Sequence, residues 1–446
     1  MKIIIGGAGA VGTHLAELLS SEKQDIILMD EDKDRLSIMD SNFDLMTVCA
    51  SPTSIQALKN AGVDDADLFI AVRPEESRNM TACMLATSLG AKKAVARIDN
   101  YEYLLPKHKE FFAKLGVHSL IYPEMLAAKD IVDAIRMSWV RQWWEFNGGA
   151  LILVGAKMRE SAEILNVPLF ELGGRKIPFH IVAIKRGNDT IIPRGDDVIK
   201  LNDIVYFTTT KKYIPYIRKI SGKDQYPDVR NVMIMGGSRI AVRTSQYAPD
   251  YMQVKIIESD LNRCHRLTNL VDDKVMVING DGRDMDLLIE EGIKSTDAVV
   301  ALTGNSETNI LACLAAKRMG VTKTVAEVEN IDYISMAESL DIGTVINKKM
   351  IAASHIYQMM LDADVTNVKC LTFANADVAE FKVKEGSRIT QKPVKDMGLP
   401  KGITIGGLIR NGEGQLVTGN TMILPGDHVV VFCLDMMIKK AEKFFN

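Results

Sequence analysis

The sequence predicts an α/β protein with two Rossmann-like, doubly wound parallel-sheet domains, each followed by a small α+β module. Three observations predict this fold class. The chain of 446 residues matches itself at a shift of about 230 residues, short apolar runs alternate with amphipathic stretches, and each half ends in a strand-rich segment. Strands that alternate with helices indicate βαβ units and a parallel sheet, and the self-match indicates that the unit occurs twice.

The self-match extends through both halves of the chain. At a shift of 230 residues, segment 61–67 falls on 291–297 and Asn79 falls on Asn309. Toward the end of each half the shift drifts to about 225 residues. So many matches near one shift indicate a duplicated sequence.

The first half supplies the elements of one βαβ domain and one strand-rich module. Five apolar runs are expected strands, at 2–5, 25–29, 45–48, 68–72 and 94–98. Amphipathic stretches between them are expected helices, at 12–19, 32–39, 53–59 and 79–89. Short strands at 181–185, 190–192 and 203–208, separated by turn-forming residues, indicate the α+β module.

Four domains follow from this pattern, at 1–122, 123–222, 228–346 and 347–446. Helices expected at 123–138 and 350–361 join each parallel-sheet domain to its module. Each helix could pack on its own domain, or it could be exchanged with a partner subunit. The polar segment 213–226 is the expected linker between the halves.

Composition excludes several classes of protein. The chain has 54 Lys+Arg against 57 Asp+Glu, a formal net charge of -3, which argues against bulk nucleic-acid binding and a polybasic membrane anchor. Its six cysteines form no C-x-x-C pair and its seven histidines show no metal-ligand spacing, so we expect a reducing compartment and no metal. No apolar stretch approaches the roughly 18 residues of a membrane span. We therefore expect a cytoplasmic protein without direct membrane insertion.

The nucleotide-binding signal is a glycine-rich turn between the first expected strand and helix. It reads Gly7-Ala8-Gly9-Ala10-Val11-Gly12, a G-x-G-x-x-G motif. In this motif the first glycine permits the tight turn, the second lets the backbone approach a pyrophosphate, and the third lets the helix pack close to the sheet. The diphosphate would lie at the helix N-terminus, where free N–H groups and the helix dipole favour an anion.

An acidic residue completes this signal. Asp30 ends the next expected strand, where its carboxylate can accept hydrogen bonds from an adenosine ribose. A carboxylate there favours NAD(H) over NADP(H). The alternative interpretation is a glycine turn in a Rossmann-like domain that binds no nucleotide.

The second half has lost part of the motif. Ser238 and Ala241 take the places of Gly9 and Gly12, and a Cβ at the close-approach position would push a pyrophosphate away. The carboxylate is retained as Glu258.

Basic residues follow the same trend. At a shift of 230, the residues Arg73, Arg78 and Arg97 meet Thr303, Thr308 and Glu327, and Ser51 meets Asp281. The three arginines lie at or after the ends of expected strands, where doubly wound sheets bind ligands, and guanidinium groups suit phosphate. We expect one competent nucleotide site in the first half, with Glu258 and Asp281 as weaker candidates for a second site.

The sequence contains no catalytic pattern that we recognise. There is no G-x-S-x-G or Walker A motif, and the histidines have no acidic partner at a recognisable spacing. We assign no catalytic residue and expect a ligand sensor that is not an enzyme. An NAD-dependent oxidoreductase is the alternative, and a structural scaffold with vestigial sites is a third possibility.

Segments of both halves resemble the TrkA family, the peripheral subunits of bacterial Trk potassium-uptake systems. The resemblance is carried by 1–12, 43–45, 62–67, 79–83 and 96–98 in the first half, and by 315–320 and 424–429 in the second. Modules of this family are of the RCK type (regulator of potassium conductance), in the order N–C–N–C. The loop 73–78 departs from the family because it lacks the Asp-Glu-Thr expected before the asparagine, whereas the second half keeps Glu307-Thr308-Asn309.

The resemblance implies a function and a set of site residues. It implies a cytoplasmic homotetramer, held at the inner face of the cell membrane through a potassium transporter subunit of TrkH or TrkG type. Gating would respond to NAD(H), and ATP or ADP could bind at the same site. The nucleotide residues carried over by position are Gly7, Ala8, Gly9, Ala10, Val11, Gly12, Asp30, Ala50, Ser51, Val72, Arg73 and Arg97.

Overall fold

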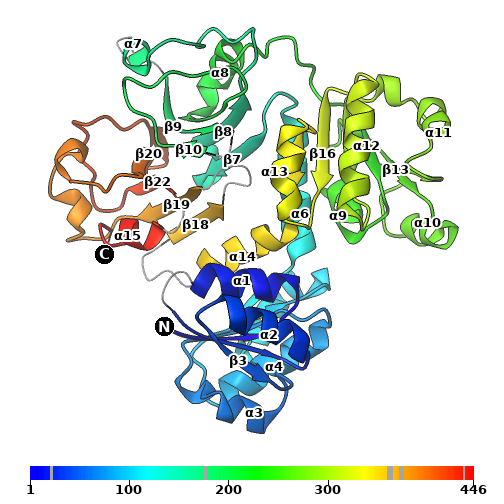
Figure 1. Cartoon of the computed structure of the whole chain (residues 1–446), viewed down its shortest axis with the longest axis vertical. Helices are drawn as coiled ribbons and strands as arrows, with labels where there is room; N and C mark the ends of the chain where they lie inside the picture. Colours follow the sequence, from blue (N-terminus) through cyan, green and yellow to red (C-terminus); the bar gives the residue numbers. More distant parts are fainter. Residues whose placement is uncertain are drawn as a thin grey trace. The chain divides into compact units, whose positions relative to one another are not determined.

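The computed structural model describes residues 1–20, 24–173, 178–187, 189–358, 365–370, 376–434 and 437–445. The chain divides into two compact units (Figure 1). The first comprises Met1–Leu126 with Lys348–Met360, and the second comprises Ala127–Asn347 with Leu361–Asn446. Each unit is described by itself below.

The first unit contains a parallel sheet of six strands. They are β1 (Lys2–Gly6), β2 (Asp25–Asp30), β3 (Met46–Cys49), β4 (Leu68–Ala71), β5 (Ala94–Arg97) and β6 (Ser119–Ile121). Their order is β3-β2-β1-β4-β5-β6, so the direction of winding reverses between β1 and β4. This order is the Rossmann order, and such sheets bind ligands outside the carboxyl ends of the strands at that point of reversal.

Buried strands and capped helices explain this local structure. Ile3, Ile4 and Ile5 are fully buried, as expected for a central parallel strand that is covered on both faces. The helices are α1 (Ala10–Ser20), α2 (Lys33–Asn42), α3 (Ile55–Asn60), α4 (Glu76–Ser88) and α5 (Pro106–Lys114). The Asp32 carboxylate caps α2 by accepting from the N–H groups of Asp34 and Arg35.

The second joining helix packs in this unit. It is α14 (Lys348–Gln358), and it lies against α1 (Figure 1). It therefore belongs with the first parallel-sheet domain rather than with the module that follows it in sequence. The end of the expected helix, 359–361, lies outside the described residues. The first joining helix is α6 (Pro123–Arg136).

The second unit contains a second parallel sheet of the same order. Its strands are β12 (Asn231–Met235), β13 (Gln253–Glu258), β14 (Met276–Asn279), β15 (Ala298–Ala301), β16 (Lys323–Glu327) and β17 (Thr344–Ile346). The order is β14-β13-β12-β15-β16-β17. The helices are α9 (Arg239–Tyr247), α10 (Leu261–Leu267), α11 (Met285–Glu290), α12 (Ser306–Arg318) and α13 (Asp332–Ser339). The repeated order confirms the predicted fold class.

Two antiparallel modules complete the second unit. The first has β7 (Gln142–Phe146), β8 (Leu151–Lys157), β9 (Phe179–Arg186), β10 (Asp189–Ile191), β11 (Ile204–Thr209), α7 (Leu169–Gly173) and α8 (Ile214–Ile220). The second has β18 (Val365–Cys370), β19 (Ala376–Lys382), β20 (Ile403–Arg410), β21 (Glu413–Gln415), β22 (His428–Leu434) and α15 (Ile438–Glu442).

Each module contains an equivalent Arg–Asp ion pair with a buried aspartate, and the two modules contact each other. Arg186 donates to both carboxylate oxygens of Asp203, at 3.0 and 2.7 Å, and Arg410 does the same to Asp427, at 2.8 and 2.7 Å. Thr208 Oγ1 of the first module donates to the carbonyl oxygen of Gly406 in the second, at 2.6 Å. Across the described ranges, no helix combines the length and hydropathy that a bilayer-spanning helix needs.

The expected linker 213–226 is wrong over half of its length. Residues Ile214–Ile220 form α8, and Ile214, Ile217 and Ile220 are buried in the core of the first module. The charged and turn-forming residues of the segment hid this apolar face in the sequence.

Lys223, in the same segment, is a buried lysine. Its side chain donates to the Tyr226 hydroxyl at 3.0 Å, and only 3% of the residue is exposed. Burial, reinforced by the nearby charges of Arg159 and Arg141, lowers the pKa of Lys223 to about 7.

Lys223→Met should make stability less dependent on pH. Between about pH 7 and the ordinary lysine pKa of about 10, the unfolded chain binds a proton at this residue that the folded chain does not bind, so stability rises with pH. Removing the amine should make the increase in the free energy of unfolding between about pH 7 and about pH 9 smaller by about 2 kcal/mol. Thermal unfolding midpoints at the two pH values measure the effect, with Lys219→Met, an exposed lysine on α8, as the control. Equal slopes in both variants would contradict the account.

Candidate functional site

A cavity opens at the point of reversal of the first sheet. Its volume is about 350 Å³, and it is lined by Gly7, Gly9, Asp30, Glu31, Asp32, Arg35, Arg73, Pro74 and Glu75. These residues come from the turn after β1, the end of β2 and the loop after β4. The site therefore lies where doubly wound sheets bind ligands.

The three motif glycines differ in what surrounds them. Gly7 has a φ of 124°, which side-chain-bearing residues rarely adopt. A Cβ on Gly12 would lie 1.8 Å from the carbonyl oxygen of Gly7, so this glycine is required by packing. A Cβ on Gly9 would have no atom within 4 Å. Gly7 and Gly12 are thus needed by the fold, whereas Gly9 borders open space.

Asp30 holds the turn in place. Its Oδ2 accepts from the N–H of Ala8 at 2.6 Å and its Oδ1 accepts from the N–H of Asp32 at 3.0 Å. The residue is 6% exposed and lines the cavity. A carboxylate has about four acceptor positions, so capacity to accept from a ligand hydroxyl remains.

Two arginines line the cavity, Arg35, which pairs with Asp32 at 3.0 Å, and Arg73. The Nη2 of Arg73 lies 3.0 Å from Glu31 Oε2 and its Nη1 lies 3.8 Å from Asp30 Oδ1. The Nε and Nη1 atoms are buried and have no hydrogen-bond partner among the residues that the structure describes. Arg78 pairs with the same Glu31 carboxylate at 3.4 Å. A buried guanidinium with unused donors suits an anionic ligand.

The other predicted residues lie near the strand ends and are not among those that line the cavity. Arg97 pairs with Glu124 on α6 at 3.2 Å. Val72 packs within 3.2 Å of the position a Gly12 Cβ would take. Ala50 donates to the carbonyl oxygen of Asp30 at 2.9 Å, and the Ser51 hydroxyl lies 3.0 Å from the Thr53 hydroxyl.

Several residues of the site were missed from the sequence, namely Glu31, Asp32, Arg35, Pro74 and Glu75 in the cavity lining and Asn79 behind it. Asn79 donates to the carbonyl oxygens of Arg73 and Arg97, both at 2.8 Å, and accepts from the Arg73 N–H at 2.9 Å. It joins the ends of β4 and β5, and its recurrence as Asn309 was the signal that could have identified it. Glu31, the partner of Arg73 and Arg78, gave no such signal in the sequence.

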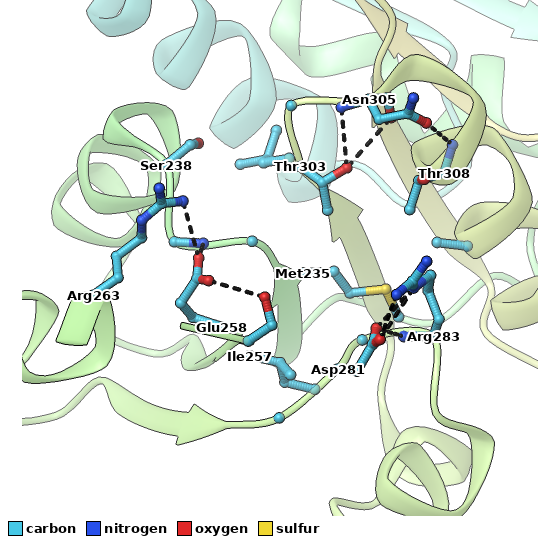
Figure 2. Close-up of a pocket in the computed structure, with 18 residues that line it drawn as sticks. Met235, Ser238, Ile257, Glu258, Arg263, Asp281, Arg283, Thr303, Asn305 and Thr308 are labelled. Carbon is cyan, nitrogen blue, oxygen red and sulfur yellow. Dashed lines mark hydrogen bonds and ion pairs between the residues drawn. The ribbon is translucent and has the colours of Figure 1, made fainter. Parts of the chain in front are cut away.

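A second cavity occupies the same place in the second parallel sheet. Its volume is about 530 Å³, and Figure 2 shows the residues that line it. Glu258 Oε2 accepts from the N–H of Gly237 at 2.8 Å, which repeats the bond between Asp30 and Ala8. Burial raises the pKa of Glu258, but the N–H groups of Asp260 and Gly237, with Arg263, outweigh burial and leave that pKa below its ordinary value.

The second cavity differs from the first in its helix terminus. Ser238 precedes α9, and its Oγ accepts from the Ala241 N–H at 3.3 Å. Gly9 precedes α1 and has no side chain with which to cap it. One first-turn N–H that could bind an anion is therefore already used in the second half.

The second cavity also carries arginines that the aligned positions did not reveal. Arg263 lies 3.5 Å from Glu258, and Arg283 lies 2.7 Å from Asp281 (Figure 2). The sequence comparison counted arginines at three aligned positions only, so it underestimated the positive charge here. Thr303 takes the place of Arg73, and its N–H donates to Asn309 at 3.0 Å as that of Arg73 does to Asn79.

The described residues contain no cluster of three or more His, Cys, Asp or Glu side chains that could hold a metal ion. Of the cysteines whose side chains are described, Cys49 is exposed and Cys83, Cys264, Cys313 and Cys433 are buried, all as free thiols.

Comparison with known families matches both kinds of module. The TrkA-N domain matches residues 3–123 and 232–348, and the TrkA-C domain matches residues 153–222 and 378–446. The Trk system potassium uptake protein TrkA of Halomonas elongata is 32% identical over 453 residues, covering 100% of this chain and 99% of that protein. The protein of the same name from Haemophilus influenzae is 32% identical over 455 residues, with the same coverage.

Solved structures share the fold at low sequence identity. The GsuK RCK domain has a TM-score of 0.63 and 15% identity, and covers 100% of this chain and 94% of that chain. The GsuK channel bound to NAD has a TM-score of 0.61 and 16% identity, and covers 100% of this chain and 78% of that chain.

Substitutions at Gly9, which precedes α1, and at Gly12, within α1, should separate the requirements of the fold from those of the cavity. Gly12→Ala places a Cβ against the carbonyl oxygen of Gly7 and should destabilise the chain by about 1–3 kcal/mol. Gly9→Val enters open space and should leave the thermal unfolding midpoint nearly unchanged. Equal destabilisation by the two substitutions would show that the turn is packed differently.

Proposed function

This chain belongs to the TrkA family, and we propose that it is the nucleotide-sensing regulatory subunit of a membrane potassium-uptake system. The relatives covered over their full length are potassium uptake proteins, which supports a regulatory role in potassium transport. Absence of a recognisable catalytic pattern supports a subunit that is not an enzyme.

The first cavity is the observation that carries this proposal. It combines a helix that begins directly after a glycine, open space at Gly9 and two Arg73 nitrogen atoms without a hydrogen-bond partner among the described residues. These features suit a diphosphate, because backbone N–H groups and a guanidinium bind phosphate oxygens without a change of protonation. Asp30 lies on the same wall and can accept from ribose hydroxyls.

NAD(H) is the proposed ligand, and ATP or ADP could occupy the same site through their shared adenosine diphosphate. A solved structure of the same fold, the GsuK channel, contains NAD, which is consistent with this choice. The proposed binding residues are Gly7, Ala8, Gly9, Ala10, Val11, Gly12, Asp30, Ala50, Ser51, Val72, Arg73 and Arg97. Arg97 would contribute only if its ion pair with Glu124 opens.

Regulation would proceed through a change in the balance between conformations of an assembly. A ligand shifts such a balance only by its difference in affinity for the conformations. We place the protein as a cytoplasmic homotetramer on a transporter subunit of TrkH or TrkG type. The proposed domain limits remain 1–122, 123–222, 228–346 and 347–446.

The second cavity is the weaker candidate site, with Glu258 and Asp281 as its acidic residues. Its volume and arginines favour an occupant, but Ser238 already caps its helix. We therefore expect weaker binding of a diphosphate there than in the first cavity.

Titration of the purified chain with NADH, NAD, ATP and ADP tests the site. Gly9→Val should abolish measurable binding of the tightest ligand, because two γ-methyl groups occupy the diphosphate position. Ser238→Gly, the matched change in the second half, should leave that affinity unchanged. An unchanged affinity in Gly9→Val would contradict the first site. Oxidation of NADH coupled to reduction of a metabolite would instead favour the oxidoreductase.

Arg73→Thr should weaken phosphate-rich ligands selectively. The substitution imports the residue found at the equivalent position in the second half, where threonine keeps the bond to its asparagine. Loss of a charge-assisted contact should reduce ADP affinity by about tenfold while adenosine affinity stays nearly constant. Calorimetry with both ligands measures the difference, and equal losses for ADP and adenosine would exclude a phosphate role.

A further inference from the structure

Four cationic side chains of the second unit converge on one carboxylate. Asp341 follows α13, and its carboxylate contacts the guanidinium groups of Arg141 and Arg159. Lys157 Nζ and Lys317 Nζ each lie 3.1 Å from the same carboxylate. Arg141, Lys157 and Arg159 come from the first antiparallel module, whereas Lys317 and Asp341 come from the second parallel-sheet domain.

Positive charge exceeds negative charge in this cluster. Four formal positive charges face the single charge of Asp341, and Lys223 lies close to Arg141 and Arg159. The other carboxyl group nearby is Glu338, whose pKa is raised by burial despite neighbouring cations. Like charges that lie close together at a partly buried site repel one another more strongly than they do in water, because the effective dielectric constant is lower. The cluster therefore has the electrostatics of a site for an additional anion.

Asp341 ends helix α13 in the left-handed backbone conformation in which many helices end. Its φ is 55°, and its N–H and that of Ile342 donate to the carbonyl oxygens of Glu338 and Ala337, at 2.9 and 3.3 Å. The Asp341 carbonyl oxygen accepts from Lys317 Nζ, and the side chain remains 26% exposed. The end of the helix therefore fixes the main chain of Asp341 and holds its carboxylate among four cations as a tethered anion.

The main chain at Arg141 is held independently of Asp341. Lys323 Nζ donates to the carbonyl oxygen of Val140 at 2.6 Å, and Thr344 Oγ1 donates to that of Arg141 at 3.1 Å. The Arg141 N–H donates to Gly155 at 2.7 Å. These bonds position Arg141 through its main chain, so its guanidinium would stay at the site if the carboxylate left.

We propose that Arg141, Lys157, Arg159 and Lys317 form a binding site for a multivalent phosphate group, which Asp341 occupies as an internal competitor. Two guanidinium groups can bind a diphosphate through paired hydrogen bonds, and such a ligand carries more negative charge than one carboxylate. Displacement of Asp341 would release the loop after α13 from the first antiparallel module. The proposal uses no residue of either nucleotide cavity and does not rest on the proposed function.

Calorimetric titration of the full chain with inorganic pyrophosphate tests the proposal. Asp341→Asn removes the competing charge, and asparagine tolerates the left-handed conformation, so affinity should rise by about tenfold. Arg159→Gln should lower affinity by about tenfold. Arg136→Gln, at an exposed arginine paired with Asp133, controls for loss of surface charge and should have no effect.

Two further titrations distinguish a free diphosphate from a nucleotide as the ligand, and this cluster from the first cavity as the binding site. Gly9→Val should leave the pyrophosphate affinity of this cluster unchanged, because the first cavity lies elsewhere. A parallel titration with ADP shows whether a nucleotide or the free diphosphate binds; sensitivity of either ligand to Arg159→Gln supports the site. If Asp341→Asn fails to fold, the difference in pyrophosphate affinity between Arg159→Gln and Arg136→Gln still tests the proposal. Affinities unaffected by both Asp341→Asn and Arg159→Gln would overturn the proposal.

Discussion

The geometry of both candidate nucleotide sites depends on one hydrogen bond, from a backbone N–H of the first turn to a buried carboxylate. Asp30 accepts from Ala8 at 2.6 Å in the first half, and Glu258 accepts from Gly237 at 2.8 Å in the second. The carboxylate stands at the end of the neighbouring strand in each case. It keeps the turn closed, so that the following helix directs its N-terminus at the crevice where the sheet reverses.

The two halves use this common scaffold differently. Gly9 leaves the helix N-terminus and the space above it free, whereas Ser238 supplies a cap from within the chain. Arg73 presents unused donors in the first half, and Thr303 replaces it with a short neutral side chain that bonds to Asn309. Duplication thus preserved the backbone, and a few side chains near the helix terminus changed what each copy can bind.

The sequence predicted correctly those features for which a single local constraint determines the residue type. The packing role of Gly12 and the open position of Gly9 followed from the motif, and the alternation of apolar runs predicted the parallel sheets. Short or edge elements were missed, such as β6, because three residues give no clear period. The helix α8 was missed because its apolar face is narrow.

Contacts between distant residues could not be predicted in this way. Arg283 reaches the second cavity from a position that has no arginine in the first half, whereas Arg263 matches Arg35, which lines the first cavity. Arg141 and Asp341 are 200 residues apart and meet only because the first module packs on the second parallel-sheet domain. No spacing rule within a strand or helix reports such a contact, although Gly116, which matches Asp341 at a shift of 225 residues, also has a left-handed backbone.

A ligand-bound crystal structure of the chain with NADH tests the central claim most directly. The account predicts a diphosphate against the first-turn N–H groups of α1, above Gly9 and beside Arg73, with a ribose hydroxyl at Asp30. A vacant first cavity with NADH bound at Ser238 and Glu258 instead would contradict it.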